Sequence, residues 1–262
     1  MRWFLAIFLA ALCIHGAEAQ TVRFPSVAVG SAPAGPEISG WLYRPSGAGP
    51  FPAIVLAHSC AGVNDHTTVW GKLLASWGYV TVAPDSFGPR GEKSVCTKGG
   101  VVSGNMRVAD VAGALDFLNA QPFVQKNHLG LIGHSHGGWT TVRAVQKSYG
   151  LAQHGLRAGV AYYPSCQAQF DSNVDVPLLI LIGDKDDWTL ADNCRRLQAA
   201  GFTRPDLVET VYYPNAYHSF DSVAPNRTVP GANGSTHRLA YEPSAAPDAE
   251  ARTKAFFEKY LR

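Results

Sequence analysis

The sequence is poor in charge and contains no cluster of charges of one sign. Charged residues make up 16% of its 262 positions, and the formal net charge is +2. Lysine and arginine are scattered, without the basic stripe of a nucleic-acid-binding protein or the polybasic cluster of a protein that binds anionic membranes. We therefore expect neither a nucleic acid nor a membrane surface as a partner of this chain.

Metal-binding spacings, repeats and linkers are also missing. No C-x-x-C or H-x-x-x-H pattern occurs, so a zinc site is the weaker interpretation of the cysteines and histidines, and we expect no metal. No internal repeat and no linker rich in proline, glycine or serine divides the chain, and 46% of its residues are hydrophobic. This length and composition can bury one large core, so we expect one domain, and a monomer, rather than two small domains.

Long hydrophobic runs are absent apart from one near the amino terminus. Arg2 precedes an apolar stretch over residues 3–14, and Ala-Glu-Ala at residues 17–19 forms an A-x-A cleavage site. The apolar stretch is too short to span a bilayer comfortably. We therefore expect residues 1–19 to be a secretory signal peptide. Residues 20–262 then form a single mature domain that is periplasmic or secreted and has no stable membrane anchor.

Export determines how the cysteines are interpreted. A lipid anchor at Cys13 is a minor alternative, because leucine precedes it where a lipoprotein cleavage box has a small residue. The other four cysteines are an even number in a chain bound for an oxidising compartment, which favours two disulfides. Of the three pairings we favour Cys60–Cys96 and Cys166–Cys194, since each links consecutive loops at one end of the expected sheet.

Strand and helix patterns alternate through most of the chain. We expect strands over residues 21–29, 38–43, 53–57, 79–83, 129–132, 159–163, 177–182 and 207–213. We expect helices over residues 67–77, 105–118, 139–147, 189–200 and 248–260, with Asp248 as the N-cap of the last. Residues 221–245 have no clear periodicity and are expected to form a polar loop. The pattern predicts an α/β fold, a mostly parallel doubly wound sheet flanked by helices, with ligand sites beyond the carboxyl ends of its strands.

A Gly-x-Ser-x-Gly pentapeptide lies between an expected strand and an expected helix. Ser135 is flanked by Gly133 and Gly137, and small residues at these positions let a strained turn hold the serine oxygen above the sheet. This context is typical of a nucleophile elbow. The alternative is a glycine-rich turn in which Ser135 is only the N-cap of the following helix.

A serine nucleophile needs a base and an acid, which in this fold follow in the order serine, acid, histidine. Asp186 follows the strand over residues 177–182, and His218 follows the strand over residues 207–213. Both therefore lie on the same rim as Ser135. His218 could instead be an ordinary loop histidine. Any of the clustered aspartates could cap the next helix, and the acid could also be one of the two neighbours of Asp186, which are Asp184 and Asp187.

An oxyanion hole needs two amide donors near the nucleophile. We expect them to be the main-chain amides of His136 and Cys60, where a disulfide at Cys60 would hold its amide rigid. The side chains of His134 and His136 diverge from the nucleophile, so we interpret them as its environment. Arg90 could bind a substrate carboxylate with both nitrogens, or it could hold its own loop.

Six segments of the sequence resemble the dienelactone hydrolase family of α/β-hydrolases. They are His58-Ser59-Cys60-Ala61-Gly62-Val63-Asn64, residues 85–91, residues 133–138, residues 183–186, Tyr217-His218-Ser219-Phe220-Asp221 and residues 241–249. The resemblance covers most of the mature chain. It implies a sheet of about eight strands, hydrolysis of esters or lactones, no cofactor, and a triad of Ser135, Asp186 and His218.

Two positions depart from the family's namesake enzymes. Those enzymes carry a cysteine where this chain has Ser135, and a glutamate in the oxyanion loop where it has Ser59. Ser59 is thus a candidate substrate contact, and a general serine carboxylesterase acting on a small-molecule ester or lactone is the expected function. Alternatives are an acyltransferase or peptidase on the same scaffold, or an exported binding protein without catalysis.

Overall fold

The computed structural model describes residues 19–167, 170–224 and 226–262. The expected signal peptide, apart from Ala19, lies outside the described residues. Among the helices that are described, none is both long and apolar enough to cross a membrane.

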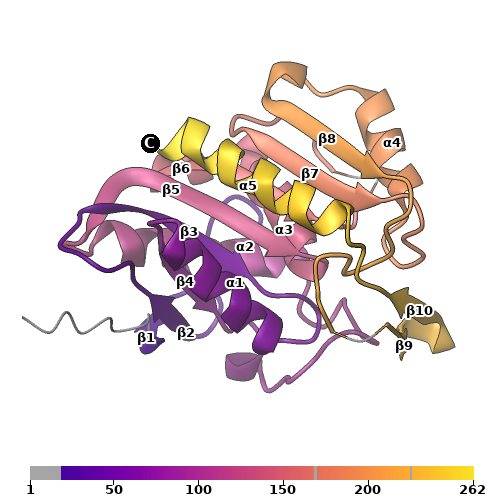
Figure 1. Ribbon diagram of the computed structural model, residues 1–262. Coiled ribbons are helices and arrows are strands. Elements are labelled where there is room, and N and C mark those ends of the chain that lie inside the picture. The colour runs from indigo at the N-terminus through magenta and orange to yellow at the C-terminus, as the bar shows by residue number, and fades with distance from the viewer. Residues whose placement is uncertain (1–18, 168–169, 225) are drawn as a thin grey trace, which may run out of the picture.

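A sheet of eight strands forms the centre of the molecule (Figure 1). Its strands are β1 (Gln20–Phe24), β2 (Ile38–Tyr43), β3 (Phe51–Ala57), β4 (Val80–Pro84), β5 (Val124–His134), β6 (Leu156–Tyr162), β7 (Leu178–Gly183) and β8 (Val208–Tyr213). Their order is β1-β2-β4-β3-β5-β6-β7-β8, and only the pairs that involve β2 are antiparallel. The predicted fold class, a mostly parallel doubly wound sheet, is confirmed.

Helices cover both faces of this sheet. The long helices are α1 (Asp65–Ser76), α2 (Gly104–Asn119), α3 (His136–Ala144), α4 (Ala191–Ala200) and α5 (Ala245–Leu261). α1 and α5 pack on one face, and α2, α3 and α4 share the core on the other (Figure 1). Short 3-10 helices occupy Gly88–Arg90, Lys147–Tyr149, Leu151–His154, Pro205–Leu207 and Ala232–Gly234.

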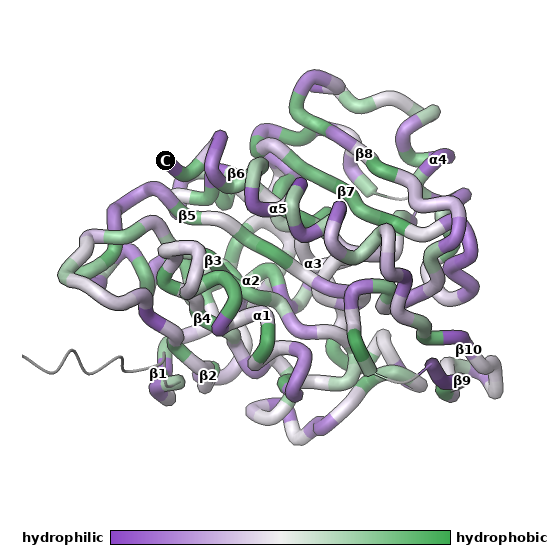
Figure 2. Tube along the Cα trace, viewed as in Figure 1, coloured by the Kyte–Doolittle hydropathy of each residue, from purple (hydrophilic) through white to green (hydrophobic). Residues whose placement is uncertain are grey.

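Strand β3 shows why the central strands are apolar throughout. Ala53, Val55 and Ala57 pack into the core beneath α2 and α3, whereas Ile54 and Leu56 pack into the core beneath α1 and α5. Successive strand residues point to opposite faces, so a strand covered on both faces must be hydrophobic at every position. The hydrophobic segments accordingly follow the inner strands in Figure 2.

The prediction for the start of the last helix is wrong. α5 begins three residues earlier than expected, and Asp248 lies in its first turn rather than at its N-cap. The Asp248 carboxylate accepts hydrogen bonds from the Tyr213 hydroxyl at 2.9 Å and from Arg252 at 2.7 Å. The carboxylate of Glu242 takes the capping role instead, because it accepts the amides of Ser244 and Ala245.

The segment over residues 221–245 contains a hairpin, which the sequence pattern did not indicate. Its strands, β9 (Arg227–Pro230) and β10 (Thr236–Leu239), pair with each other beside the carboxyl edge of the main sheet (Figure 1). Several contacts attach the hairpin to that edge: Leu239 forms a β-bridge with His218, the His237 ring stacks on Trp188 at 4.7 Å, and the Arg238 amide donates to the Asp187 carboxylate. Such short strands are stable only with contacts of this kind, which a local pattern does not reveal.

Candidate active site

Ser135 occupies a strained turn between the end of β5 and the start of α3. Its φ of 55° and ψ of −110° are unfavourable for a residue with a side chain. A Cβ atom at Gly133 would lie 2.1 Å from the Gly137 carbonyl oxygen, and one at Gly137 would lie 2.0 Å from the Ala57 carbonyl oxygen. Both positions therefore require glycine. Ser135 precedes the helix, but its side chain caps no helix amide.

Ser135, His218 and Asp186 form one chain of hydrogen bonds. Ser135 Oγ lies 2.8 Å from His218 Nε2, and His218 Nδ1 lies 2.8 Å from Asp186 Oδ2. An ionised carboxylate can only accept, so Nδ1 carries the proton and Nε2 is free to accept the proton of Ser135. All three residues are buried, with exposed fractions of 6%, 1% and 3% in the order named. This arrangement can activate the Ser135 hydroxyl for nucleophilic attack.

Asp186 is distinguished from its two acidic neighbours by its contacts. Asp184 forms an exposed ion pair with Arg195, and the half-exposed carboxylate of Asp187 accepts the Arg238 amide. Neither of these carboxylates contacts His218 within the part of the chain that the structure describes. The geometry thus favours Asp186 over both alternatives.

Thr189 is a site residue that the sequence analysis missed. Its amide donates to Asp186 Oδ1 at 2.8 Å, beside the Trp188 amide at 2.9 Å. Its hydroxyl lies 2.9 Å from Asp186 Oδ2 and 3.2 Å from His218 Nδ1. These contacts fix the carboxylate relative to the imidazole. The available signal was an aspartate followed three residues later by threonine, which is typical of a side-chain-closed turn.

The peptide that carries the Cys60 amide is held on both sides. The Ser59 carbonyl oxygen accepts a hydrogen bond from His58 Nδ1 at 2.8 Å, while the Ser86 amide donates to His58 Nε2. The Cys60 carbonyl oxygen accepts the Val95 amide at 2.8 Å. Within the described residues, the Cys60 amide itself donates to no protein acceptor. A free amide in a fixed peptide is suited to bind a developing oxyanion.

The second expected amide donor is that of His136, the first residue of α3. The first amides of a helix have no acceptor within the helix and lie at the positive end of its dipole. Because His136 follows Ser135 directly, its amide is near the reacting oxygen. The amides of Cys60 and His136 thus remain our expectation for the oxyanion hole.

The two histidines beside Ser135 are buried and uncharged at neutral pH. Burial lowers the pKa of His134 to about 3, and its ring packs against Trp70 and Tyr162. Burial and the Arg107 guanidinium lower the pKa of His136 to about 3. Arg107 donates to His136 Nδ1 at 2.9 Å. Both imidazoles therefore act as packed parts of the elbow rather than as proton-transfer groups.

The two disulfides join the pairs that the sequence favours. One connects Cys60 to Cys96, with 4.8 Å between their Cα atoms, and both residues line the cavity above Ser135. The other connects Cys166, which follows β6, to Cys194 in α4. Only the first of these disulfides belongs to the expected oxyanion loop.

The structure corrects the substrate-binding interpretation of Arg90. Both guanidinium nitrogens of Arg90 lie 2.8 Å from the carboxylate oxygens of Asp110, and one also donates to the Ser86 carbonyl at 2.7 Å. Asp110 is completely buried, and Arg90 does not line the cavity above Ser135. A buried carboxylate requires such a partner. Arg90 therefore holds its own loop to α2, which is the alternative that the sequence left open.

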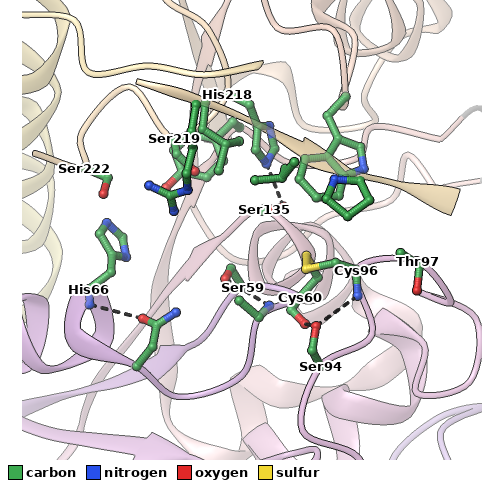
Figure 3. A pocket seen from close by; sticks show the side chains of 18 residues that line it. Ser59, Cys60, His66, Ser94, Cys96, Thr97, Ser135, His218, Ser219 and Ser222 are labelled. Atoms are coloured by element: carbon green, nitrogen blue, oxygen red, sulfur yellow. Dashed lines mark hydrogen bonds between the residues drawn. A yellow bond between two sulfur atoms is a disulfide. The ribbon is translucent and has the colours of Figure 1, made fainter. Parts of the chain in front are cut away.

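A cavity of about 300 Å³ opens above Ser135 (Figure 3). Ser59, the other expected substrate contact, lines it together with Ser135 and His218. The sequence analysis missed most of its wall, which comes from loops and from the hairpin. The missed lining residues are Ala61, Asn64, His66, Ser94, Thr97, Tyr163, Trp188, Ser219, Ser222, Arg227, Val229, Pro230 and Leu239.

One group of side chains in the described part of the chain has the spacing of metal ligands. It comprises His66, His134 and Asp221, with ligand atoms within 4.8 Å of one another. Asp221 already accepts hydrogen bonds from His66, Trp70 and Tyr163 at 2.8–2.9 Å. Burial opposes ionisation of Asp221, but His66, His134 and Tyr163 hold its pKa below the usual range. The Asp221 carboxylate is thus satisfied without a metal, whereas His134 Nε2 lies 3.6 Å from Asp221 Oδ2 and has no hydrogen-bond partner within the described residues. The absence of a metal remains a prediction.

Comparison with known proteins gives consistent matches. The model of the dienelactone hydrolase family matches residues 38–261. A Synechocystis sp. protein assigned as a carboxymethylenebutenolidase is 23% identical over 246 residues, which cover 86% of this chain and 93% of that protein.

Solved structures share the fold. The dienelactone hydrolase of Anabaena variabilis superposes with a TM-score of 0.66 and 21% identity, covering 95% of this chain and all of that one. An acylaminoacyl peptidase of Pyrococcus horikoshii superposes with a TM-score of 0.65 and 18% identity, covering 95% of this chain and 42% of the peptidase. At these identities, the superpositions establish the architecture alone.

Proposed function

The chain belongs to the dienelactone hydrolase family and is a carboxylic ester hydrolase, and we propose that it cleaves esters or lactones with Ser135 as its nucleophile. The observation that carries this proposal is the chain of two 2.8 Å hydrogen bonds from Ser135 through His218 to Asp186. The Ser135 end of these hydrogen bonds lies at a cavity that can admit a small molecule.

The first step forms an acyl-enzyme. His218 Nε2 takes the proton of Ser135 as Oγ attacks the ester carbonyl carbon, and the carbonyl oxygen becomes an oxyanion. The amides of Cys60 and His136 stabilise that oxyanion, and the Asp186 carboxylate stabilises the imidazolium of His218. The proton then passes from His218 to the leaving alcohol, which departs as the carbonyl re-forms.

The second step releases the acid. His218 takes a proton from a water molecule as that water attacks the carbonyl carbon of the acyl group bonded to Ser135 Oγ. The same two amides stabilise the second oxyanion. Collapse of this intermediate returns the proton to Ser135 Oγ and frees the carboxylic acid. A lactone follows the same course, except that its alcohol and acid remain in one molecule.

Ser135→Ala tests the assignment of the nucleophile. We expect the variant to lose hydrolysis of p-nitrophenyl acetate while it keeps the melting temperature of the parent, because Ser135 Oγ serves chemistry rather than packing. Product analysis with an added alcohol or amine separates an esterase from an acyltransferase, and a peptide substrate tests for a peptidase. Unchanged ester hydrolysis in the Ser135→Ala variant would overturn the proposal.

We further propose that residues 1–19 direct export and that residues 20–262 form a single mature periplasmic or secreted domain. Two disulfides support this proposal, since disulfides persist in oxidising compartments. Sequencing of the protein recovered from outside the cytoplasm tests it, with Gln20 expected as the first residue.

A further inference from the structure

A second cavity adjoins the cavity above Ser135. It has a volume of about 580 Å³, compared with about 300 Å³ for the cavity at the nucleophile. Four residues line both cavities: Asn64, His66, Ser222 and Arg227. In Figure 3, His66 and Ser222 lie at one end of the first cavity and Thr97 at the other, with Ser135 between them. The second cavity thus adjoins the first at the end that His66 and Ser222 line.

The walls of this second cavity carry several large apolar side chains. One wall comes from α1 and the opposite wall from the segment after Asp221 and from the start of α5. The apolar lining side chains, which we call the apolar groove, are Val69, Trp70, Leu73, Val223, Ala224, Tyr241, Ala246 and Pro247. Four charged residues also line this cavity: Asp65, Asp221, Arg227 and Glu250. The Asp221 carboxylate is hydrogen-bonded to His66 and Trp70.

Exposed hydrophobic side chains concentrate in the apolar groove. Five large hydrophobic residues of the described chain are exposed, and three of them line this groove: Val69 at 59%, Val223 at 82% and Tyr241 at 38%. The other two, Val101 and Leu190, line neither cavity. Exposed apolar side chains scattered singly need no explanation, but a cluster in a groove marks a binding surface.

We propose that the apolar groove binds the hydrocarbon chain of the ester substrate, while the ester group lies at Ser135. This inference rests on the proposed hydrolase function and specifies its substrate class as esters with an unbranched apolar chain of several carbons. The four residues that line both cavities support it, since they place the apolar groove directly beside the cavity above Ser135. A groove of about 580 Å³ also matches the volume of a small-molecule site.

Two series of substrates test this inference. The first varies the acyl chain in p-nitrophenyl esters from acetate to octanoate, and the second varies the alcohol in acetate esters from ethyl to octyl. Each methylene that becomes buried is expected to raise kcat/KM about fourfold. Three buried methylenes would give a rise of about sixtyfold, so we expect a rise of at least that size over one of the series. That series identifies which side of the ester enters the apolar groove. A flat response in both series would overturn the inference.

Substitution of the groove separates this explanation from a general preference for hydrophobic substrates. Val69→Asp and Val223→Asp each place a charge against the chain, and both residues are exposed enough to tolerate the change. In the series that responds to chain length, we expect each variant to lower the ratio of kcat/KM for the longest ester to kcat/KM for the shortest ester about tenfold. Val101→Asp is the matched control, because Val101 is 53% exposed outside both cavities. An unchanged ratio in both groove variants, or an equal fall in the control, would contradict the inference.

The same experiments distinguish failure of the inference from failure of the proposed function. If Ser135 is not the nucleophile, Ser135→Ala keeps its activity toward all chain lengths. If the apolar groove instead binds a protein or a membrane, short esters are hydrolysed by Ser135 but the chain-length ratio does not respond to Val69→Asp or Val223→Asp.

Discussion

Ser135 Oγ lies within hydrogen-bond distance of His218 Nε2, at 2.8 Å, although 83 positions separate the two residues in the chain. Ser135 follows β5, whereas His218 follows β8 at the far edge of the sheet. The segment after β8 turns back across the neighbouring strand ends, where the Lys185 amide donates to the Ala216 carbonyl at 3.0 Å. The proposed base, His218, therefore reaches the proposed nucleophile, Ser135, through a loop, and groups that hold this loop should affect turnover.

Thr189→Val tests the support of the triad acid. The variant removes the hydroxyl next to Asp186 and His218 but keeps the main-chain amide that donates to Asp186. A hydrogen bond to a charged group contributes about 1.5–3 kcal/mol, so we expect kcat to fall about 10- to 100-fold with little change in KM. Steady-state kinetics measure this effect, and Thr189→Ser should restore most of kcat. Equal losses in both variants would assign the effect to packing.

The disulfide at the oxyanion loop should affect both stability and catalysis. Replacing Cys60 and Cys96 by alanine opens a link across 36 positions, which should lower the free energy of unfolding by about 3 to 4 kcal/mol. It should also lower kcat about tenfold, since the Cys60 amide becomes less ordered. Replacing Cys166 and Cys194 by alanine is the control, with a similar stability loss but kcat close to the parent. Denaturant unfolding measures the stability of both variants, and steady-state kinetics measure their kcat. An equal fall of kcat in both variants would contradict the prediction.

Stability should fall on acidification because of three buried histidines. Burial is the main cause that lowers the pKa of His58, His134 and His136 in the folded protein. Below the unfolded pKa of about 6.5 the unfolded chain binds protons that the folded chain excludes. Stability is therefore full above about pH 6.5 and is lost as the pH falls toward 3.

The contribution of one histidine can be isolated. Each proton that the folded protein excludes changes the free energy of unfolding by about 1.4 kcal/mol per pH unit. His136→Gln should therefore reduce the slope of the free energy of unfolding against pH, between pH 6 and pH 5, by up to that amount. Urea unfolding at a series of pH values measures the slope. A slope equal to that of the parent would show that His136 is protonated in the folded protein.

Arg90→Met should destabilise the protein rather than weaken substrate binding. The variant leaves the buried Asp110 carboxylate without its partner, at an expected cost of about 3–5 kcal/mol. The double variant Arg90→Met, Asp110→Asn removes the unpaired charge and should recover part of this loss. Urea unfolding gives the stabilities. If Arg90 contacted substrate instead, the KM for esters that carry a carboxylate would rise in a variant of near-parent stability.

The sheet could be predicted from the sequence because its inner strands are buried on both faces. Short continuous apolar runs such as residues 53–57 and 177–182 are typical of strands covered on both faces. The observed strands match these runs within a few residues. The tight turn at Ser135 between a strand and a helix could equally be predicted. Close backbone contacts require glycine at positions 133 and 137. The Gly-x-Ser-x-Gly pattern in the sequence therefore reflects the geometry of this turn.

Other parts depend on tertiary contacts that local patterns do not encode. The hairpin of β9 and β10 is stabilised by the stacking of His237 on Trp188, between segments far apart in the sequence. Asp248 resembled an N-cap, but Glu242 takes that role from outside the helix. Thr189 is a common polar residue in a loop, and only its position against Asp186 gives it a role.

Labelling with a fluorophosphonate tests the central claim most directly. The probe reacts with a serine only when a base has activated its hydroxyl, and peptide mapping by mass spectrometry then identifies the modified residue. We expect one phosphonylated residue, Ser135, and loss of labelling in His218→Ala, in which Ser135 is still present. Labelling at another residue, or labelling of Ser135 that persists without His218, would contradict it.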